Sequence, residues 1–467
     1  MKIRLSDHFT YGRLLRFTFP SVVMLVFTSV YGVVDGFFVS NFAGKTPFAA
    51  VNFIMPFLMI LGCAGFMFGT GGGALIAKTL GEGRREKANE LFSLIVYTSI
   101  VCGVALALFG FVGIRPIASL MGAEGQLLED SVRYGRIVLP AIPFYVLQYE
   151  FQCLFVTAEK PKPGLYVTVA AGVANIILDA LFVAVFHWGM EGAAAATAFS
   201  QFVGGVIPLF YFGRKNQSLL QLVRLNGRPD LRALVRTCTN GSSELMSNIS
   251  MSLVSMLYNI QLMRYAGEDG IAAYGVLMYV SLIFQAVFIG YSVGSAPVIG
   301  YHYGAGHQKE LGGLLKKSHL LVGGSAVLMF AAGQLLARPL SYLFAGYDPD
   351  LMELTVRGFR FFSCSFLCSG FAIFGSSFFT ALGDGLTSAL VSFLRTLVFQ
   401  CLAVLIFPLF WAVDGIWMSI VAAEVLAAGV TFLFLTGKRK RYGYWERLIK
   451  RGSGKTGLVK EAGHRML

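Results

Sequence analysis

Charged residues are scarce in this chain of 467 residues. Asp, Glu, Lys and Arg make up 13% of it, whereas 56% of the residues are hydrophobic. Soluble globular domains carry about 25% charged residues. The composition therefore excludes an ordinary soluble enzyme or binding domain and indicates a membrane protein.

Cysteine and histidine are also few, with seven and six residues. No cysteine spacing matches a zinc site or a secreted disulfide framework. The chain has no His-Glu-x-x-His and no Gly-x-Ser-x-Gly motif, and no histidine lies near Asp35 or Asp179, two acids considered below. These absences argue against an intramembrane enzyme, and we expect neither catalysis nor a cofactor.

A phosphate-binding loop is incomplete as well. The segment Gly452-Ser-Gly-Lys-Thr456 resembles the end of such a loop, but its first glycine would fall at position 449, which is Ile. No strand precedes it, and the motif needs that context. We therefore expect no ATPase activity in this chain.

Apolar blocks, in contrast, are long and numerous. Crossing roughly 30 Å of hydrocarbon takes about 20 residues of helix, and lipid offers no partners to open backbone groups. The sequence predicts an all-α polytopic membrane protein with twelve transmembrane helices, at about 14–40, 49–78, 89–113, 133–157, 164–186, 191–213, 236–264, 270–300, 317–337, 355–381, 386–408 and 414–436.

The net charge of +13 is unevenly distributed along this topology. Most Lys and Arg lie at the N-terminus, in the even-numbered loops and in the tail. Such loops remain cytoplasmic. We therefore expect a multi-pass protein of the inner (plasma) membrane with both termini in the cytoplasm. Its basic segments 214–236 and 438–441 would lie near anionic lipid, and we expect no nucleic-acid partner.

The chain also repeats itself at an offset of 223 residues. The repeated landmarks are Gly71 and Gly294, Gly81 and Gly304, Thr157-Ala158 and Thr380-Ala381, and Glu191-Gly192 and Asp414-Gly415. Paired repeats in a membrane protein are typical of secondary transporters, with the binding site between them. Six crossings in each copy give both copies the same orientation. We predict two parallel six-helix bundles related by a pseudo-twofold axis along the membrane normal.

Four segments follow from this repeat. Residues 1–213 form the predicted N-terminal bundle, and residues 236–436 form the C-terminal bundle. A basic cytoplasmic linker at 214–235, with a turn signal at Asn226-Gly-Arg-Pro229, joins them, and a basic cytoplasmic tail occupies 437–467. We expect a monomer that contacts membrane lipid.

Polar residues within the first six helices mark a candidate ion site. Asp35 lies well inside the first helix, and Asn175 precedes Asp179 by four residues, which places both on one helix face. Thr197 adds a hydroxyl from the sixth helix. Carboxylate, amide and hydroxyl oxygens suit Na⁺ or can hold a proton. The second copy lacks this set, because Asp35 aligns with Tyr258.

Other intramembrane acids are candidates for the substrate. Charged groups at this depth are costly and are therefore functional candidates. Glu150 lies in the fourth helix and Glu244 in the seventh, and we add Asn248 and Tyr258 as neighbours of Glu244 along the seventh helix. We interpret Arg395 and Glu424, in the last two helices, as a structural pair.

At these residues the chain resembles the multidrug and toxic compound extrusion (MATE) family. The resemblance rests on the twin six-helix units, Pro20 and Asp35 in the first helix, Asn175-x-x-x-Asp179 in the fifth, and Gly192 with Thr197 in the sixth. It implies a V-shaped pair of bundles that exchanges H⁺ or Na⁺ for organic cations and other amphipathic drugs by alternating access. It also implies that the residues around Asp35 form the coupling-ion site, which could bind Na⁺.

Several alternatives stay open at this point. A flippase for lipid-linked oligosaccharides, from the same superfamily, would need a cavity rich in Arg and Lys, whereas Arg395 is the only base found in mid-helix. A channel is a further alternative. The sequence distinguishes neither H⁺ from Na⁺ nor one exported compound from another.

Overall fold

The computed structural model describes residues 3–39, 42, 45–215, 218–225, 230–346 and 348–444. Regular structure in these residues is helical throughout. The predicted turn at Asn226–Pro229 and the tail beyond residue 444 lie outside the described residues. Many large apolar side chains face outward, among them Val112 and Leu335, as expected for helices that contact lipid.

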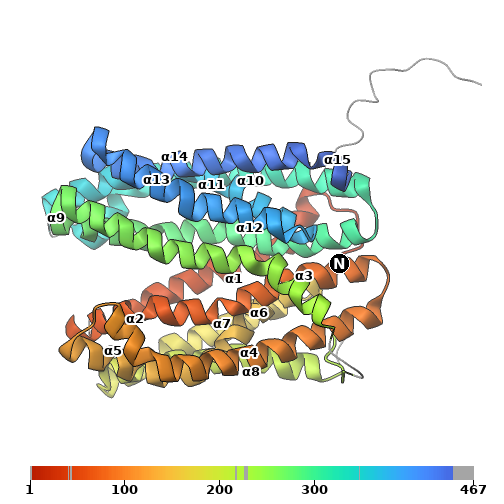
Figure 1. Ribbon diagram of the computed structural model, residues 1–467, viewed down its shortest axis with the longest axis horizontal. Coiled ribbons are helices and arrows are strands. Elements are labelled where there is room, and N and C mark those ends of the chain that lie inside the picture. Colours follow the sequence, from red (N-terminus) through yellow and green to blue (C-terminus); the bar gives the residue numbers. More distant parts are fainter. Residues whose placement is uncertain are drawn as a thin grey trace, which may run out of the picture.

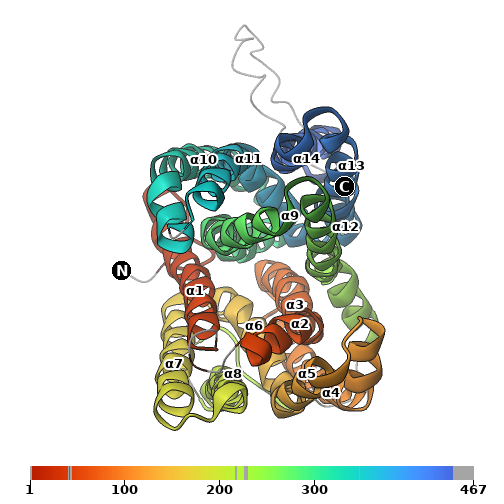
Figure 2. The same ribbon diagram turned by 90° about the vertical axis from the view of Figure 1, so that its left-hand side faces the viewer.

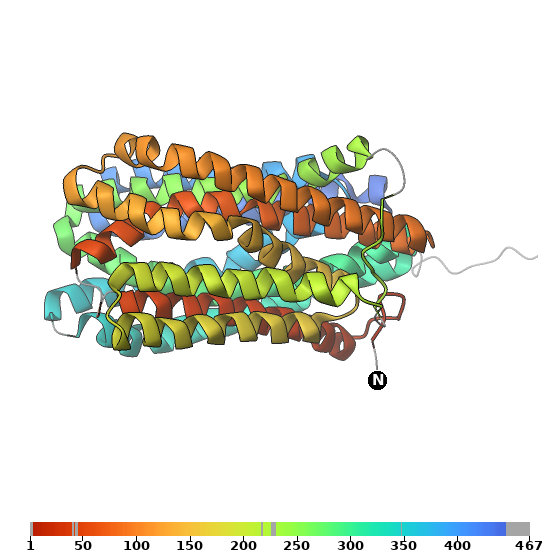
Figure 3. The same ribbon diagram turned by 90° about the horizontal axis from the view of Figure 1, so that it is seen from below.

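The first half of the chain forms one group of helices, which we call the first lobe (Figure 1). Its helices are α1 (Tyr11–Phe38), α2 (Lys45–Gly62), α3 (Ala64–Gly81), α4 (Arg85–Leu120), α5 (Gly125–Val138), α6 (Ile142–Thr157), α7 (Pro161–Asp179) and α8 (Gly189–Gly213), with a 3₁₀ turn η2 (Leu139–Ala141) and a π-helical segment η3 (Ala180–Val185). Helices α7 and α8 run side by side along the molecule (Figure 3).

The second half forms the second lobe, which lies beside the first when the molecule is viewed along its long axis (Figure 2). Its helices are α9 (Leu231–Gly304), α10 (Gln308–Ala345), α11 (Pro349–Ala381), α12 (Gly385–Phe393), α13 (Phe399–Ile406), α14 (Pro408–Gly437) and α15 (Arg439–Tyr442), with a π-helical segment η4 (Leu394–Val398). Asp230, Asp348 and Asp384 cap the starts of α9, α11 and α12 by accepting backbone hydrogen bonds.

Eleven segments of the described residues are long and apolar enough to cross a membrane. The predicted helix 236–264 is not one of them, although it is helical as the first part of α9. The chain reverses at Gly267, where φ is 63° and ψ −150°, so that the rings of Tyr258 and Tyr274 stack at 5.1 Å. Polar residues such as Glu244 and Asn248 reduce the hydropathy of this helix, because it lines the cavity described below.

The two lobes meet through α1, α3 and α9. The contact is closest toward one end of the molecule, which we call the terminal end because residues 3–10, residues 218–225 and α15 all lie there (Figure 1). A Cβ on Gly81 would fall 2.0 Å from the carbonyl oxygen of Tyr301, and a Cβ on Gly304 would fall 2.1 Å from that of Lys78. Positions 78 and 81 correspond to 301 and 304 at the 223-residue offset, so the contact is reciprocal.

Candidate functional site

The predicted ion-site residues come together inside the first lobe. Asp35 is supplied by α1, Asn175 and Asp179 by α7, and Thr197 by α8, and α7 packs against both other helices. Asp35 is 8% exposed, Asn175 2% and Asp179 0%. Asn175 and Asp179 are both buried on the inner face of α7, as their four-residue spacing predicts.

Most polar atoms of this group lack a hydrogen-bond partner among the described residues. These atoms are Oδ1 of Asp35, both carboxylate oxygens of Asp179, Nδ2 of Asn175 and Oγ1 of Thr197. Buried polar groups are nearly always hydrogen-bonded, and buried carboxylates need a compensating charge or a proton. The unpartnered oxygens therefore fit a bound cation or protons.

The two carboxyl groups lie close enough to influence each other electrostatically. Two negative charges at close range inside a protein repel strongly. A proton or a monovalent cation between Asp35 and Asp179 would remove this repulsion. The arrangement thus favours the uptake of positive charge.

Two tyrosines beside this group were not predicted from the sequence. Tyr134 of α5 is fully buried, its hydroxyl has no hydrogen-bond partner among the described residues, and it lies close to Thr197, Asp35 and Asp179. Tyr31 lies one helical turn before Asp35 and interacts with it. The four-residue spacing could have identified Tyr31, whereas only the tertiary fold brings Tyr134 here.

The helix changes its winding immediately after Asp179. Residues Ala180–Val185 form the π-helical segment η3. Short π-helical segments are frequent at functional sites, because they shift the backbone hydrogen-bond register and re-aim the side chains. This segment is therefore a local place at which α7 could adjust when the charge of Asp179 changes.

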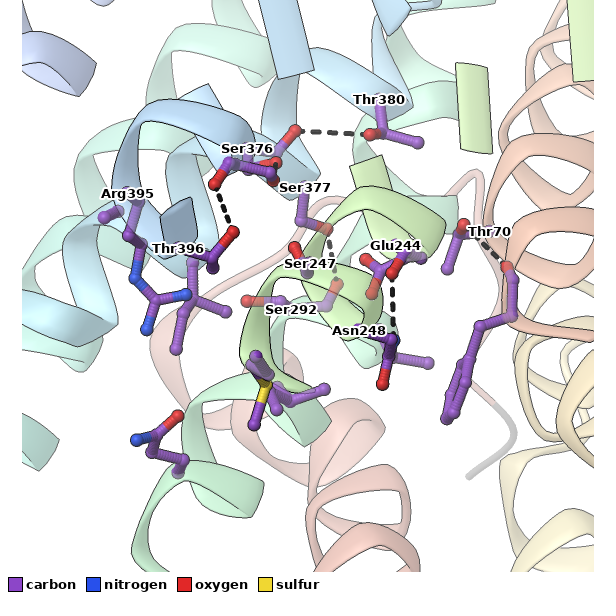
Figure 4. A pocket seen from close by; sticks show the side chains of 18 of the residues that line it. Thr70, Glu244, Ser247, Asn248, Ser292, Ser376, Ser377, Thr380, Arg395 and Thr396 are labelled. Carbon is purple, nitrogen blue, oxygen red and sulfur yellow. Dashed lines mark hydrogen bonds between the residues drawn. The ribbon is translucent and has the colours of Figure 1, made fainter. Parts of the chain in front are cut away.

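A separate cavity of about 240 Å³ lies mainly within the second lobe and reaches the contact between the lobes. It is lined by α9, α11, the α12–α13 region and α14, and the first lobe contributes Leu25 of α1, residues of α3 such as Thr70, and Cys153 and Thr157 of α6. Figure 4 shows Glu244 and Asn248 approaching it from α9 and Arg395 from another wall. The cavity combines apolar walls with a few polar groups, as ligand pockets do.

Three of the four predicted substrate residues line this cavity, namely Glu244, Asn248 and Tyr258. Asn248 donates to the backbone carbonyl of Glu244 at 2.8 Å, which leaves the Glu244 carboxylate available. The hydroxyl of Tyr258 donates to Oε1 of Gln400 at 2.9 Å. The structure therefore gathers these residues on one side of the cavity.

Glu150 does not line this cavity. It is 0% exposed, and its Oε2 accepts a hydrogen bond from the Ser99 hydroxyl of α4. The structure thus places the Glu150 side chain between α6 and α4, where it does not reach the cavity lined by Cys153 of the same helix.

Arg395 and Glu424 form an ion pair, as predicted. Nε of Arg395 lies 3.0 and 2.8 Å from the two carboxylate oxygens of Glu424. Both side chains line the cavity. Arg395 is the only basic residue among the described residues that line it.

The described residues contain no cluster of three or more His, Cys, Asp and Glu that could hold a metal ion. This observation does not bear on Na⁺, since the predicted ligands include Asn175 and Thr197. The group around Asp35 supplies oxygen atoms, which monovalent cations prefer.

A family model of known proteins matches both repeats of this chain. The family model MatE matches residues 20–181 and again residues 245–406, which together are more than half of the chain. One model therefore matches both copies of the repeat; the first match ends within η3 and the second at the last residue of α13.

Curated relatives cover nearly the whole chain. The multidrug export protein MepA of Staphylococcus haemolyticus (strain JCSC1435) is 23% identical over 436 residues, 92% of this chain and 94% of that protein. MepA of Staphylococcus aureus (strain NCTC 8325 / PS 47) is 23% identical over 430 residues, with the same coverage.

Solved structures share the fold. A multidrug resistance MATE family transporter of the MOP superfamily in an outward-facing conformation gives a TM-score of 0.88 at 22% identity, covering 93% of this chain and 97% of that one. A MOP superfamily transporter from Pyrococcus furiosus gives 0.86 at 22% identity, covering 93% and 97%. With one family model matching both repeats over more than half of the chain, the chain belongs to the MatE family, the multidrug and toxic compound extrusion transporters.

Proposed function

We propose that this protein is a secondary active transporter that exports cationic or amphipathic small molecules in exchange for H⁺ or Na⁺. The observation that carries the proposal is the separation of two sites. Unpartnered buried carboxyl groups lie in the first lobe, whereas the larger cavity with Glu244 lies mainly in the second. Exchange of two unlike ligands needs two such sites that communicate.

Helix α1 provides the connection between these sites. It carries Asp35 of the ion group, and its Leu25 lines the cavity. It also packs against α7 in the first lobe and α9 in the second. Uptake of a cation at Asp35 and Asp179 would remove their repulsion and change the packing of α1, which would alter the cavity and release the substrate.

The proposed transport cycle treats residues 1–213 and 236–436 as two lobes that move relative to each other. The terminal end would face the cytoplasm of a plasma membrane, because its loops carry most of the Lys and Arg. Alternating access would then open and close the contact at Gly81 and Gly304. We propose a monomer as the working unit, since both lobes of the fold are present in one chain.

The lining of the cavity does not favour the flippase alternative. A cavity for a lipid-linked pyrophosphate would present several basic groups, whereas the described lining contains Arg395 alone, and Glu424 is paired with it.

The proposal is tested by efflux of ethidium from proteoliposomes under an imposed pH gradient or Na⁺ gradient, one at a time. We expect one gradient to drive transport and Asp179→Asn to abolish it, because an amide cannot take up a proton or balance a cation. Asp35→Asn should have the same effect.

Glu129→Gln serves as the control, since Glu129 is 57% exposed and pairs with Arg115 on the surface. This variant should transport normally. Normal gradient-driven efflux in Asp179→Asn would contradict the ion-site proposal, and no efflux by the wild type under either gradient would contradict the transport proposal itself.

A further inference from the structure

Arg395 occupies an unusual place for a residue that only holds two helices together. It lies in the π-helical segment η4, and its side chain is 13% exposed, facing the cavity. The first lobe also contains a π-helical segment, η3, which directly follows Asp179 although it does not lie at the repeat-equivalent position. Each lobe thus places a charged side chain at the point where a transmembrane helix changes its winding.

The guanidinium group retains unused hydrogen-bond donors. Only Nε contacts Glu424. Nη1 and Nη2 make no hydrogen bond to any of the described residues, and these terminal nitrogens carry four of the five N–H donors of an arginine. In a purely structural pair, the guanidinium more often engages a carboxylate through two nitrogens.

The pair is also absent from the otherwise equivalent first lobe. At the 223-residue offset, Gly172 stands in place of Arg395 and Gln201 in place of Glu424. Both residues are buried in helices α7 and α8, which pack together without an ion pair. The bundle architecture therefore does not require this pair, which suggests that the second lobe uses it for a ligand.

The charges around the cavity are complementary to a dipolar molecule. Glu244 reaches the cavity from α9 and interacts electrostatically with Arg395 (Figure 4). We propose that Nη1 and Nη2 of Arg395 form a binding site for a carboxylate, so that the cavity accepts compounds that carry both a cationic group, near Glu244, and a carboxylate, at Arg395. This inference rests on the proposed transport function and specifies the ligand of its cavity.

A carboxylate fits this site better than a phosphate. The paired Nη donors match two carboxylate oxygens in one plane. A phosphate would bring about two negative charges beside Glu424 and Glu244, and the described lining offers no second base. A ligand that carries one carboxylate and one cationic group has no net charge. Its binding therefore leaves the net charge of the cavity unchanged.

Two matched ligands test the site. Tetramethylrhodamine carries a cationic ring system and a free carboxylate, and its methyl ester has the same ring system without the carboxylate charge. Fluorescence polarisation with the purified full chain measures the affinity for each. In Arg395→Gln/Glu424→Gln, which removes both charges together, we expect affinity for the acid to fall on the order of tenfold or more and affinity for the ester to stay unchanged.

Two single variants sharpen the test. Glu424→Gln should bind the acid more tightly than the wild type, because it frees the guanidinium. Arg395→Lys should retain only part of the preference for the acid over the ester, because an ammonium lacks the planar pair of donors.

Competition by small anions tests the carboxylate directly. Excess benzoate should compete with the acid and leave the ester bound, and stronger competition by inorganic phosphate would contradict the assignment to a carboxylate.

The outcomes separate the two proposals. Equal loss of acid and ester in the double variant would show a structural role and overturn the carboxylate site. Wild-type protein that binds the ester but not the acid would overturn the site and leave the proposed function intact. Wild-type protein that binds neither would remove support for both.

Discussion

Ala412 has a backbone conformation that residues with a side chain rarely adopt, with φ 47° and ψ −125°. At the 223-residue offset its counterpart is Gly189, which has φ 58°. The turn that leads into the last helix of each lobe thus requires a positive φ, and the second lobe supplies it with alanine. Such a conformation costs a non-glycine residue about 1–3 kcal/mol.

We expect Ala412→Gly to stabilise the protein by about 1 kcal/mol, because the relief of strain exceeds the roughly 0.5–1 kcal/mol of added chain entropy. Thermal unfolding in detergent measures the change. Gly189→Ala is the matched control and should lower stability. A Cβ at that position meets no atom within 4 Å, so any loss reports the backbone alone. Destabilisation by Ala412→Gly would contradict the strain argument.

Asp384 anchors the last described residues at the terminal end. Its carboxylate accepts hydrogen bonds at 2.7 Å from Lys438 and from the Tyr442 hydroxyl. Burial alone would raise the pKa of Asp384, but these hydrogen bonds outweigh burial and hold the pKa below its ordinary value. The carboxylate is therefore ionised throughout the physiological range.

Asp384→Asn should destabilise the protein by roughly 1–3 kcal/mol, because it replaces charged hydrogen bonds at a largely buried site. A depressed pKa gives stability that is present above the unfolded-state value of about 3.9 and is lost as the pH falls through the folded-state value. The difference in melting temperature between wild type and variant should thus be constant from pH 5 to 8 and shrink below about pH 4. Asp414→Asn, at an exposed pair with Arg357, should have little effect at any pH.

Single residues also show which parts of the site the sequence could predict. Asp35, Asn175 and Asp179 could be predicted because a charge within an apolar block is conspicuous and spacing within one helix fixes the face. Tyr134 and the orientation of Glu150 could not, because both depend on the rotation of one helix against another. The ion-coupling role of the group remains a prediction.

At the scale of helices, the contact between α3 and α9 depends on glycine. Backbone carbonyls of Lys78 and Tyr301 occupy the space that a Cβ on Gly304 or Gly81 would need. A side chain at either glycine would push α3 and α9 apart by about the size of a methyl group. Such a change should disfavour the conformation in which the terminal end is closed.

We therefore expect Gly81→Ala and Gly304→Ala each to shift the population toward a state with the terminal end open. Spin labels on the exposed Glu86 and Lys309 would report longer distances between the lobes. Gly324→Ala is the matched control, because a Cβ there meets no atom within 4 Å. An unchanged distance distribution in both interface variants would show that this contact does not hold the lobes together.

The helices themselves were largely predictable from apolar length, but their boundaries were not. Block 49–78 spans α2 and α3, which are separated at Cys63, and block 386–408 contains a π-helical segment. Irregularities of this kind follow from packing rather than from hydropathy. The helix at 236–264 was predicted as one of the apolar blocks, although its polar residues lower its hydropathy below that of the other spans.

Across the whole molecule, residues 3–10, which we call the terminal strap, tie the two lobes together. The backbone N–H of Leu5 donates to Glu159 of the first lobe at 2.6 Å, and that of Phe9 donates to Glu310 of the second at 3.0 Å. Leu5 and Phe9 are fully buried. The strap must therefore release at least one lobe before the terminal end can open.

Phe9→Ala should weaken this attachment, since loss of a buried Phe side chain costs about 3–5 kcal/mol. We expect faster hydrogen–deuterium exchange at the ends of α3 and α9 and unchanged exchange at η3, at the opposite end. Tyr11→Ala is the control, because Tyr11 is 42% exposed and should leave exchange unaltered. Uniformly faster exchange in Phe9→Ala would indicate general destabilisation instead of a local strap.

The reciprocal contact of Gly81 with Tyr301 and Gly304 with Lys78 has the form of an isologous interface, in which residue i of one partner meets residue j of the other and the reverse. Such geometry is the signature of a homodimer. The molecule can thus be regarded as two subunits fused head to tail, whose ancestor would have been a single six-helix protein that paired with itself. Because the reciprocal contact is kept in one chain, a substitution on one side of the interface can be offset by its counterpart 223 residues away, and the two halves are free to diverge elsewhere.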